Sequence, residues 1–202
     1  MNVHRSLARP TLFLLLAFYF ASQVIPGRAG SVVIDQPEPE PQWAVEAQTA
    51  ALFGVNNVND YLLAPQILSL WWQPPGENWR GVEFGLAGMI EPVIQGPESF
   101  LGGGAITFRY TWRPSQWPVH PYFTARLGAG GIDSRGVRDG QGQDFVFLAQ
   151  GELGLRTDLT RNLSIQAGIL YQHISNAGLS EPDRPNVGLD AFGPFLGLRY
   201  QF

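Results

Sequence analysis

The sequence contains no cysteine and no lysine. The absence of cysteine excludes a disulfide framework, a thiolate nucleophile and a cysteine-based metal site. All 13 basic residues are arginine, and the formal net charge of -4 gives no reason to expect nucleic-acid binding. Apart from the apolar run at residues 11–21, no segment is long and apolar enough for a transmembrane helix. The chain is instead rich in aromatic residues (12%) and glycine (24 residues), a combination typical of transmembrane β-barrels.

The first residues predict an export signal. Arg5 and Arg9 precede the apolar run, which is short for a bilayer span and is followed by small residues with Pro26 and Gly27. We therefore expect a signal peptide over residues 1–29, cleaved near Ala29, and the alternative is an uncleaved N-terminal anchor. Residues 30–42 are rich in proline and acidic residues and predict a flexible leader. The remaining residues, 43–202, suffice for one domain.

Residues 43–202 predict strands, because apolar and polar residues alternate in segments of roughly ten residues separated by turn-forming clusters. The second segment alternates poorly and carries Pro65, which a central strand disfavours. The number of segments, eight, is an even number that membrane barrels allow. The predicted fold is all-β, an eight-stranded antiparallel transmembrane β-barrel, with strands at 43–54, 61–73, 79–91, 99–113, 120–130, 144–157, 162–175 and 190–202.

Residue parity assigns the two faces of the predicted wall. An arginine facing lipid near the midplane costs roughly 2 to 4 kcal/mol, so charged positions should fill the interior as paired networks. An eight-stranded barrel is just wide enough to be filled by side chains, which excludes a diffusion pore and makes the inner charges structural. The predicted outward residues are Arg80, Val82, Phe84, Leu86, Ile90, Phe100, Ile106, Phe108, Tyr110, Trp112, Phe145, Phe147, Leu153 and Leu155. The predicted inward charges are Glu46, Glu83, Arg109, Arg126, Glu152, Arg156 and Arg199.

The chain ends on an alternating strand, FGPFLGLRYQF, whose last residue is the aromatic Phe202. This segment resembles the C-terminal strand by which the assembly machinery recognises bacterial outer-membrane proteins. The resemblance implies an outer-membrane location with Phe202 at the periplasmic rim. The 176–189 connection is then extracellular and the short DLTRN turn periplasmic, in line with the short-turn, long-loop asymmetry of such barrels.

His173 and Ser175 continue the odd-numbered apolar face of the strand at 162–175, so parity places a base and a hydroxyl side by side on the outer wall. Asp190 shares even parity with the outward residues of the last strand. It therefore meets His173 and Ser175 on the outer wall, at the extracellular end of the two strands. Serine needs a base, and the base needs an orienting acid, so this group suggests an esterase acting on a lipid. A polar strand end that leads into a turn is the alternative interpretation.

Oxyanion stabilisation requires hydrogen-bond donors near the serine. The backbone after Ser175, from Asn176 to Gly178, and the side chain of Asn186 are the candidates. No cofactor is needed for this chemistry. Three histidines without cysteine predict no zinc site, and the acidic, glycine-rich run at 132–144 lacks the register of a calcium-binding EF-hand loop.

The segment HISNAGL, followed by PNVGLD at 185–190 and the closing aromatic strand, resembles the outer-membrane lipid A 3-O-deacylases (PagL type), also called acyloxyacyl hydrolases. The resemblance implies a barrel with a serine-histidine-acid triad on its outer face. Such an enzyme removes an ester-linked 3-hydroxyacyl chain from the lipid A of lipopolysaccharide, among the lipids of the outer leaflet. By motif position, Ser175 is the nucleophile, His173 the base and Asp190 the acid, while Asn176, Gly178 and Asn186 fall in the oxyanion-hole segments.

The sequence departs from the family pattern in two ways. Asp190 stands where the family usually has glutamate, and the link between the two motifs is lengthened by SEPDR. Glu181 and Asp183 in this link are alternative acids. Two other functions therefore stay open: a weak or inactive barrel with a structural or surface-interaction role, and a phospholipase that uses the same triad.

Overall fold

The computed structural model describes residues 42–55, 60–112, 117–138, 140–181, 183–184 and 186–202. The predicted signal peptide (1–29) and the predicted leader up to residue 41 lie outside these ranges. No helix within them is long and apolar enough to cross a membrane. The elements are β1 (Gln42–Ala50), β2 (Leu52–Gly54), β3 (Leu62–Leu63), β4 (Gln66–Gln73), the 3-10 helix η1 (Glu77–Trp79), β5 (Val82–Gln95), β6 (Phe100–Thr111), β7 (Val119–Ile132), β8 (Phe145–Asp158), β9 (Leu163–Ser175) and β10 (Leu189–Gln201).

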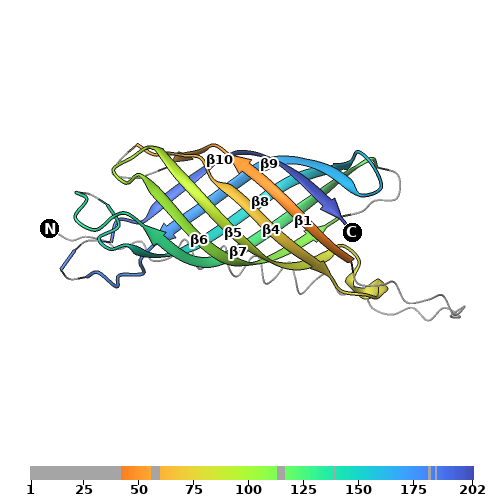
Figure 1. The fold of residues 1–202 in the computed structure, drawn as a ribbon, viewed down its shortest axis with the longest axis horizontal. Helices are drawn as coiled ribbons and strands as arrows, with labels where there is room; N and C mark the ends of the chain where they lie inside the picture. Colours follow the sequence, from red (N-terminus) through yellow and green to blue (C-terminus); the bar gives the residue numbers. More distant parts are fainter. Residues whose placement is uncertain (1–41, 56–59, 113–116, 139, 182, 185) are drawn as a thin grey trace, which may run out of the picture. The chain divides into compact units, whose positions relative to one another are not determined.

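These strands form one closed antiparallel barrel (Figure 1). β1 and β2 are successive pieces of the first span, and β3 and β4 are successive pieces of the second. Each span pairs with its neighbours in the chain, and the first span also pairs with β10, which closes the sheet. The prediction of an eight-stranded antiparallel barrel is therefore confirmed.

The first two spans are each interrupted where the sequence predicted one continuous strand. Pro65 has no N–H group to give to the ladder, and its carbonyl oxygen accepts a hydrogen bond from Ala50 at 3.1 Å. Opposite this point, the N–H of Ala51 donates to the carbonyl of Pro194 at 3.1 Å. A side chain at Gly193 would collide with the Ala51 carbonyl, so β10 needs glycine where the first span bends against it.

The outer wall is apolar, as parity predicted. Leu86, Ile106 and Leu153 are each at least 64% exposed, and Phe84, Ile90, Phe100, Trp112, Phe145, Phe147 and Leu155 are exposed beside them. Arg80 is the exception: Gly81 has a positive φ of 83° and turns the chain, so β5 begins at Val82 and Arg80 lies in the preceding turn. An exposed apolar band around a closed barrel is the surface expected to face lipid.

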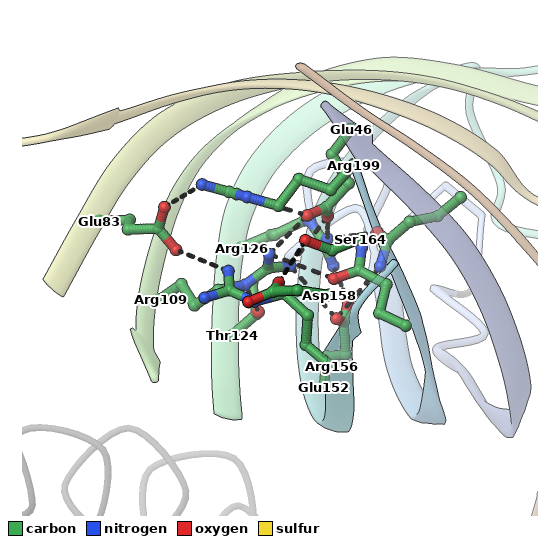
Figure 2. A network of polar contacts seen from close by, with 12 residues as sticks. Glu46, Glu83, Arg109, Thr124, Arg126, Glu152, Arg156, Asp158, Ser164 and Arg199 are labelled. Carbon is green, nitrogen blue, oxygen red and sulfur yellow. Dashed lines mark hydrogen bonds and ion pairs between the residues drawn. The ribbon is translucent and has the colours of Figure 1, made fainter. Parts of the chain in front are cut away.

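One layer of the interior, toward the end where β8 finishes and β9 begins, is a charged network. All seven predicted inward charges are buried in it. The guanidinium of Arg109 donates to both carboxylate oxygens of Glu46, at 2.5 and 2.8 Å, and Arg126 donates to Glu152 at 2.7 Å. Arg109 also stacks 4.3 Å from the ring centroids of both Trp71 and Tyr122. Figure 2 shows these charges converging from several strands inside the barrel, which confirms their predicted inward direction.

The other layer of the interior is mainly apolar, a division that the sequence did not predict. It fills the barrel toward the end where β9 finishes and β10 begins. Ile174 and Leu189 belong to it and are paired across these strands, at 1% and 3% exposure. A close-packed core thus backs the stretch of wall that carries His173 and Asp190. Its other members include Leu52, Leu63, Ile67, Met89, Leu101, Ile132, Val146 and Leu148.

Candidate active site

Adjacent strands β9 and β10 bring His173 and Asp190 together. The two residues are direct partners in the antiparallel register. Their inward neighbours Gln172 and Ile174 are buried, whereas His173, Ser175 and Asp190 are half-buried on the outer wall. The structure therefore places all three predicted triad residues on one face, at one end of the barrel.

The imidazole of His173 pairs with the carboxylate of Asp190, with 2.8 Å between Nδ1 and Oδ1. The two side chains are 34% and 39% exposed, so the pair lies at the surface of the wall. A carboxylate that accepts Nδ1–H leaves Nε2 as the basic nitrogen of the neutral ring. Among the three acids that the sequence left as candidates, Asp190 is the one that the structure pairs with His173.

Tyr171 also contacts this carboxylate, although the sequence pattern assigned it only to the odd-numbered apolar face of the strand at 162–175. Its hydroxyl donates to Oδ1 of Asp190 at 2.5 Å. Tyr171 shares the outer face with His173 and pairs with Phe192 on β10, which makes it a diagonal neighbour of Asp190. The signal that could have revealed it is the polar tip of a tyrosine two residues before a histidine on the same face.

Ser175 is the last residue of β9, and its Oγ lies in a tight turn. The oxygen accepts hydrogen bonds from the backbone N–H of Ala177 at 3.0 Å and from Nδ2 of Asn186 at 3.1 Å. Ala177 has a φ of 54°, in the left-handed region that alanine rarely adopts. Such strain persists where surrounding contacts enforce it and is common at active sites.

The other two residues predicted for the oxyanion hole have different contacts. Asn176 is fully buried, and its Nδ2 donates to the carbonyl of Gln141 at 2.5 Å and to Ser180 at 2.7 Å. The N–H of Gly178 donates to Oδ1 of Asn176 at 2.8 Å. Neither group points at the serine, because the asparagine side chain turns inward and closes its own turn. Asn186 does reach the serine, and Ala177 supplies the backbone donor.

An open groove of about 330 Å³ adjoins His173 and Ser175 on the outer wall. Across the β8–β9 register, Ala149 pairs with His173 and Phe147 pairs with Ser175. The small alanine leaves space beside the imidazole, and the phenylalanine forms a wall beside the serine. The groove is lined by Leu127, Gly128, Phe147, Leu148, Ala149, His173, Ser175 and Ala177.

His120 lies apart from this site. It lines a polar hollow of about 190 Å³ with Arg156, Asp158 and Arg161, near the β8–β9 turn at the opposite end of the strands. Within the described ranges, no three histidine or acidic side chains come together in a way that could hold a metal ion.

Comparisons with known proteins give the fold and the family. The crystal structure of Neisserial surface protein A (NspA) matches with a TM-score of 0.59 and 18% identity, covering 79% of this chain and 97% of that one. The crystal structure of the outer membrane enzyme PagL matches with a TM-score of 0.56 and 19% identity, covering 76% of this chain and 97% of that one. Both likenesses show the fold, an outer-membrane type of barrel.

A search of curated proteins finds no match. The family model described as lipid A 3-O-deacylase (PagL) matches residues 60–199. This range is more than half of the chain and includes β9, most of β10 and the connection that carries Asn186. The chain therefore belongs to the lipid A 3-O-deacylase (PagL) family.

Proposed function

We propose that the protein is a serine esterase that removes the ester-linked 3-hydroxyacyl chain from the 3-O position of lipid A. The reaction takes place in the outer leaflet of the bacterial outer membrane. The observation that carries this proposal is the pairing of His173 with Asp190 at 2.8 Å on the outer wall, beside Ser175 and the groove. Membership in the lipid A deacylase family supports the substrate class.

The chemistry follows from the order of these groups. Nε2 of His173 accepts the proton of Ser175 while Oγ attacks the ester carbonyl, and Asp190 holds Nδ1–H and stabilises the imidazolium. The imidazolium then protonates the leaving alkoxide of lipid A. Water, deprotonated by the same histidine, releases the fatty acid from Ser175. The overall reaction consumes one ester and one water and needs no cofactor.

Two donors already converge on the serine oxygen. The N–H of Ala177 and Nδ2 of Asn186 both lie within 3.1 Å of Oγ. The oxyanion of the tetrahedral intermediate forms on the carbon bonded to Oγ, two bonds away from this oxygen, so the same donors are near enough to stabilise it after a small shift. We assign the oxyanion hole to Ala177 and Asn186, with Asn176 and Gly178 shaping the turn.

The outer wall explains how the substrate reaches the serine. Phe147 and Leu127 border the groove and belong to the apolar band, so an acyl chain lying in the leaflet can enter it sideways. The substrate is thus delivered by lateral diffusion. β10 ends at Gln201, at the rim opposite the site, and we propose that the assembly machinery recognises this strand.

Mass spectrometry of lipid A tests the proposal. Expressing the full chain in a lipopolysaccharide-bearing host should yield lipid A that lacks one 3-hydroxyacyl chain. Ser175→Ala and His173→Ala should leave lipid A intact, while heat-modifiable migration on gels shows that each variant is a folded barrel. Unchanged lipid A beside folded wild-type protein would refute the proposed activity.

An assay with purified protein decides between lipid A and a phospholipid as the substrate. Purified protein in detergent is given lipopolysaccharide or a glycerophospholipid, and the released fatty acids are quantified. Release from the phospholipid alone would replace lipid A deacylation by phospholipase activity.

A further inference from the structure

We propose that Gln141, in the connection between β7 and β8, is a positioning residue for the oxyanion hole. This inference rests on the proposed esterase function. Gln141 is 1% exposed, so it lies inside the rim and contacts no lipid substrate. Its role is to hold the two donors of Ser175 in place from behind.

Gln141 bonds to both segments that carry the donors. Its backbone carbonyl accepts a hydrogen bond at 2.5 Å from Nδ2 of Asn176, the residue between Ser175 and Ala177. Its side-chain Nε2 donates to the carbonyl of Val187, the residue after Asn186. One residue, more than thirty positions earlier in the chain, therefore joins the start and the end of the β9–β10 connection.

The first of these bonds fixes the strained turn. With Nδ2 held by Gln141 and by Ser180, Oδ1 of Asn176 faces the N–H of Gly178 and accepts from it at 2.8 Å. This arrangement encloses Ala177 and maintains its φ of 54°, which directs its N–H to Ser175. Without the anchor, the left-handed alanine would relax toward an ordinary conformation, because backbone strain of this kind persists only where surrounding contacts enforce it.

Gln141 is itself fixed by a buried carboxylate from another loop. Its N–H lies 2.5 Å from Oγ of Ser134 and 3.2 Å from Oε1 of Glu98. Glu98, 3% exposed, also accepts from Ser134 at 3.0 Å and, through Oε2, from the hydroxyl of Tyr61 at 2.7 Å. A Cβ atom at Gly140 would lie 2.8 Å from Oε1 of Glu98, so the space beside this carboxylate has no room for a further carbon atom. Three loops of the rim thus converge behind the serine.

Kinetics separate positioning from folding. Gln141→Ala removes the side-chain bond to the carbonyl of Val187, the residue after Asn186, and keeps the backbone carbonyl that accepts from Asn176. The variant therefore tests the positioning of Asn186, and kcat for fatty-acid release should fall by about 10- to 100-fold, since a displacement of about 1 Å in a catalytic group has that effect. KM should change by less than about twofold, because the acyl groove is lined by other residues and the lost contact acts on the transition state. Glu98→Ala should share the loss. Glu98→Gln should recover most of the activity, because an amide oxygen still accepts from Ser134 and from the N–H of Gln141.

Gln166→Ala is the matched control. Gln166 is equally buried, at 1% exposure, but it lies in the charged layer, where it contacts Arg109. This variant should lower stability and leave kcat unchanged. Wild-type kcat in folded Gln141→Ala, or an equal loss of kcat in Gln166→Ala, would overturn the positioning role while the esterase itself stands. A wild-type protein that releases no fatty acid would overturn both proposals.

Discussion

Replacing Asp190 by asparagine isolates the role of the acid. The substitution keeps the size of the side chain. One oxygen of Asp190, Oδ1, contacts both Nδ1 of His173 at 2.8 Å and the hydroxyl of Tyr171 at 2.5 Å. An amide nitrogen in the place of this oxygen would donate to Nδ1, and the Tyr171 hydroxyl would accept from it instead of donating. The ring would be driven into the tautomer with a proton on Nε2, and it could not take the proton of Ser175.

The expected loss is about 10³-fold in kcat. A buried aspartate in a serine triad contributes about 10⁴-fold when tested by this substitution. Asp190 is 39% exposed and His173 34% exposed, so neighbouring polar groups can replace part of its effect. We therefore expect about a tenfold smaller loss, equivalent to about 4 kcal/mol of transition-state stabilisation.

The assay is the initial rate of fatty-acid release from saturating lipopolysaccharide in detergent micelles. Asp190→Glu is the control, because it restores the carboxylate usual in the family, and its kcat should lie within about tenfold of the wild type. Folded Asp190→Asn that retains more than about a tenth of wild-type kcat would refute the assignment of Asp190 as the orienting acid.

Three further predictions concern other contacts of the barrel. Tyr171→Phe removes the 2.5 Å hydrogen bond to Asp190. Because a hydrogen bond to a charged group contributes about 1.5–3 kcal/mol, kcat should fall about tenfold at constant KM. An unchanged kcat would show that Asp190 needs no second partner. Arg109→Met leaves buried Glu46 without its bidentate partner and should lower the free energy of unfolding by about 3–5 kcal/mol. Urea unfolding in lipid vesicles measures this change, and a loss below about 1 kcal/mol would contradict the prediction. Partial desolvation raises the pKa of Asp133, but the N–H groups of Phe100 and Ser99 donate to its carboxylate and bring the pKa below its ordinary value. Its tether between loops should therefore be complete above the unfolded value of about 3.9 and weaken as pH falls through the lower folded value, seen as a shift of the Phe100 amide resonance that Asp133→Asn abolishes.

The spans and the direction of most side chains could be predicted because lipid and lumen impose opposite chemistry on alternate residues. Leu153 and Glu152, for example, are adjacent in sequence, yet one is 66% exposed to lipid and the other is 1% exposed inside the barrel. The same alternation placed His173 and Ser175 on the outer wall. It failed at Arg80, because a turn at Gly81 interrupts the period before β5 begins.

What the sequence did not reveal depends on contacts between distant segments. The division of the interior into a charged and an apolar layer follows from the height of each residue in the barrel, and this height depends on strand register. Gln141 lies in a polar, glycine-rich loop with no recognisable motif, and its importance appears only where that loop meets Asn176 and Val187. Within the predicted segment from Asn176 to Gly178, the backbone N–H that reaches Ser175 is that of Ala177 and not that of Gly178, and this choice likewise depends on how Asn176 closes its turn.

The position of Ser175 on the outside of a filled barrel constrains how the proposed enzyme is measured. Substrate and products share a two-dimensional phase, so the rate depends on the mole fraction of lipid A around the barrel and not on its concentration in the bulk solution. Added inert detergent or phospholipid should slow turnover, because it lowers the mole fraction of lipid A in the micelle or bilayer that surrounds the barrel. The freed fatty acid remains in the bilayer beside the groove until it diffuses away, because the packed lumen provides no exit.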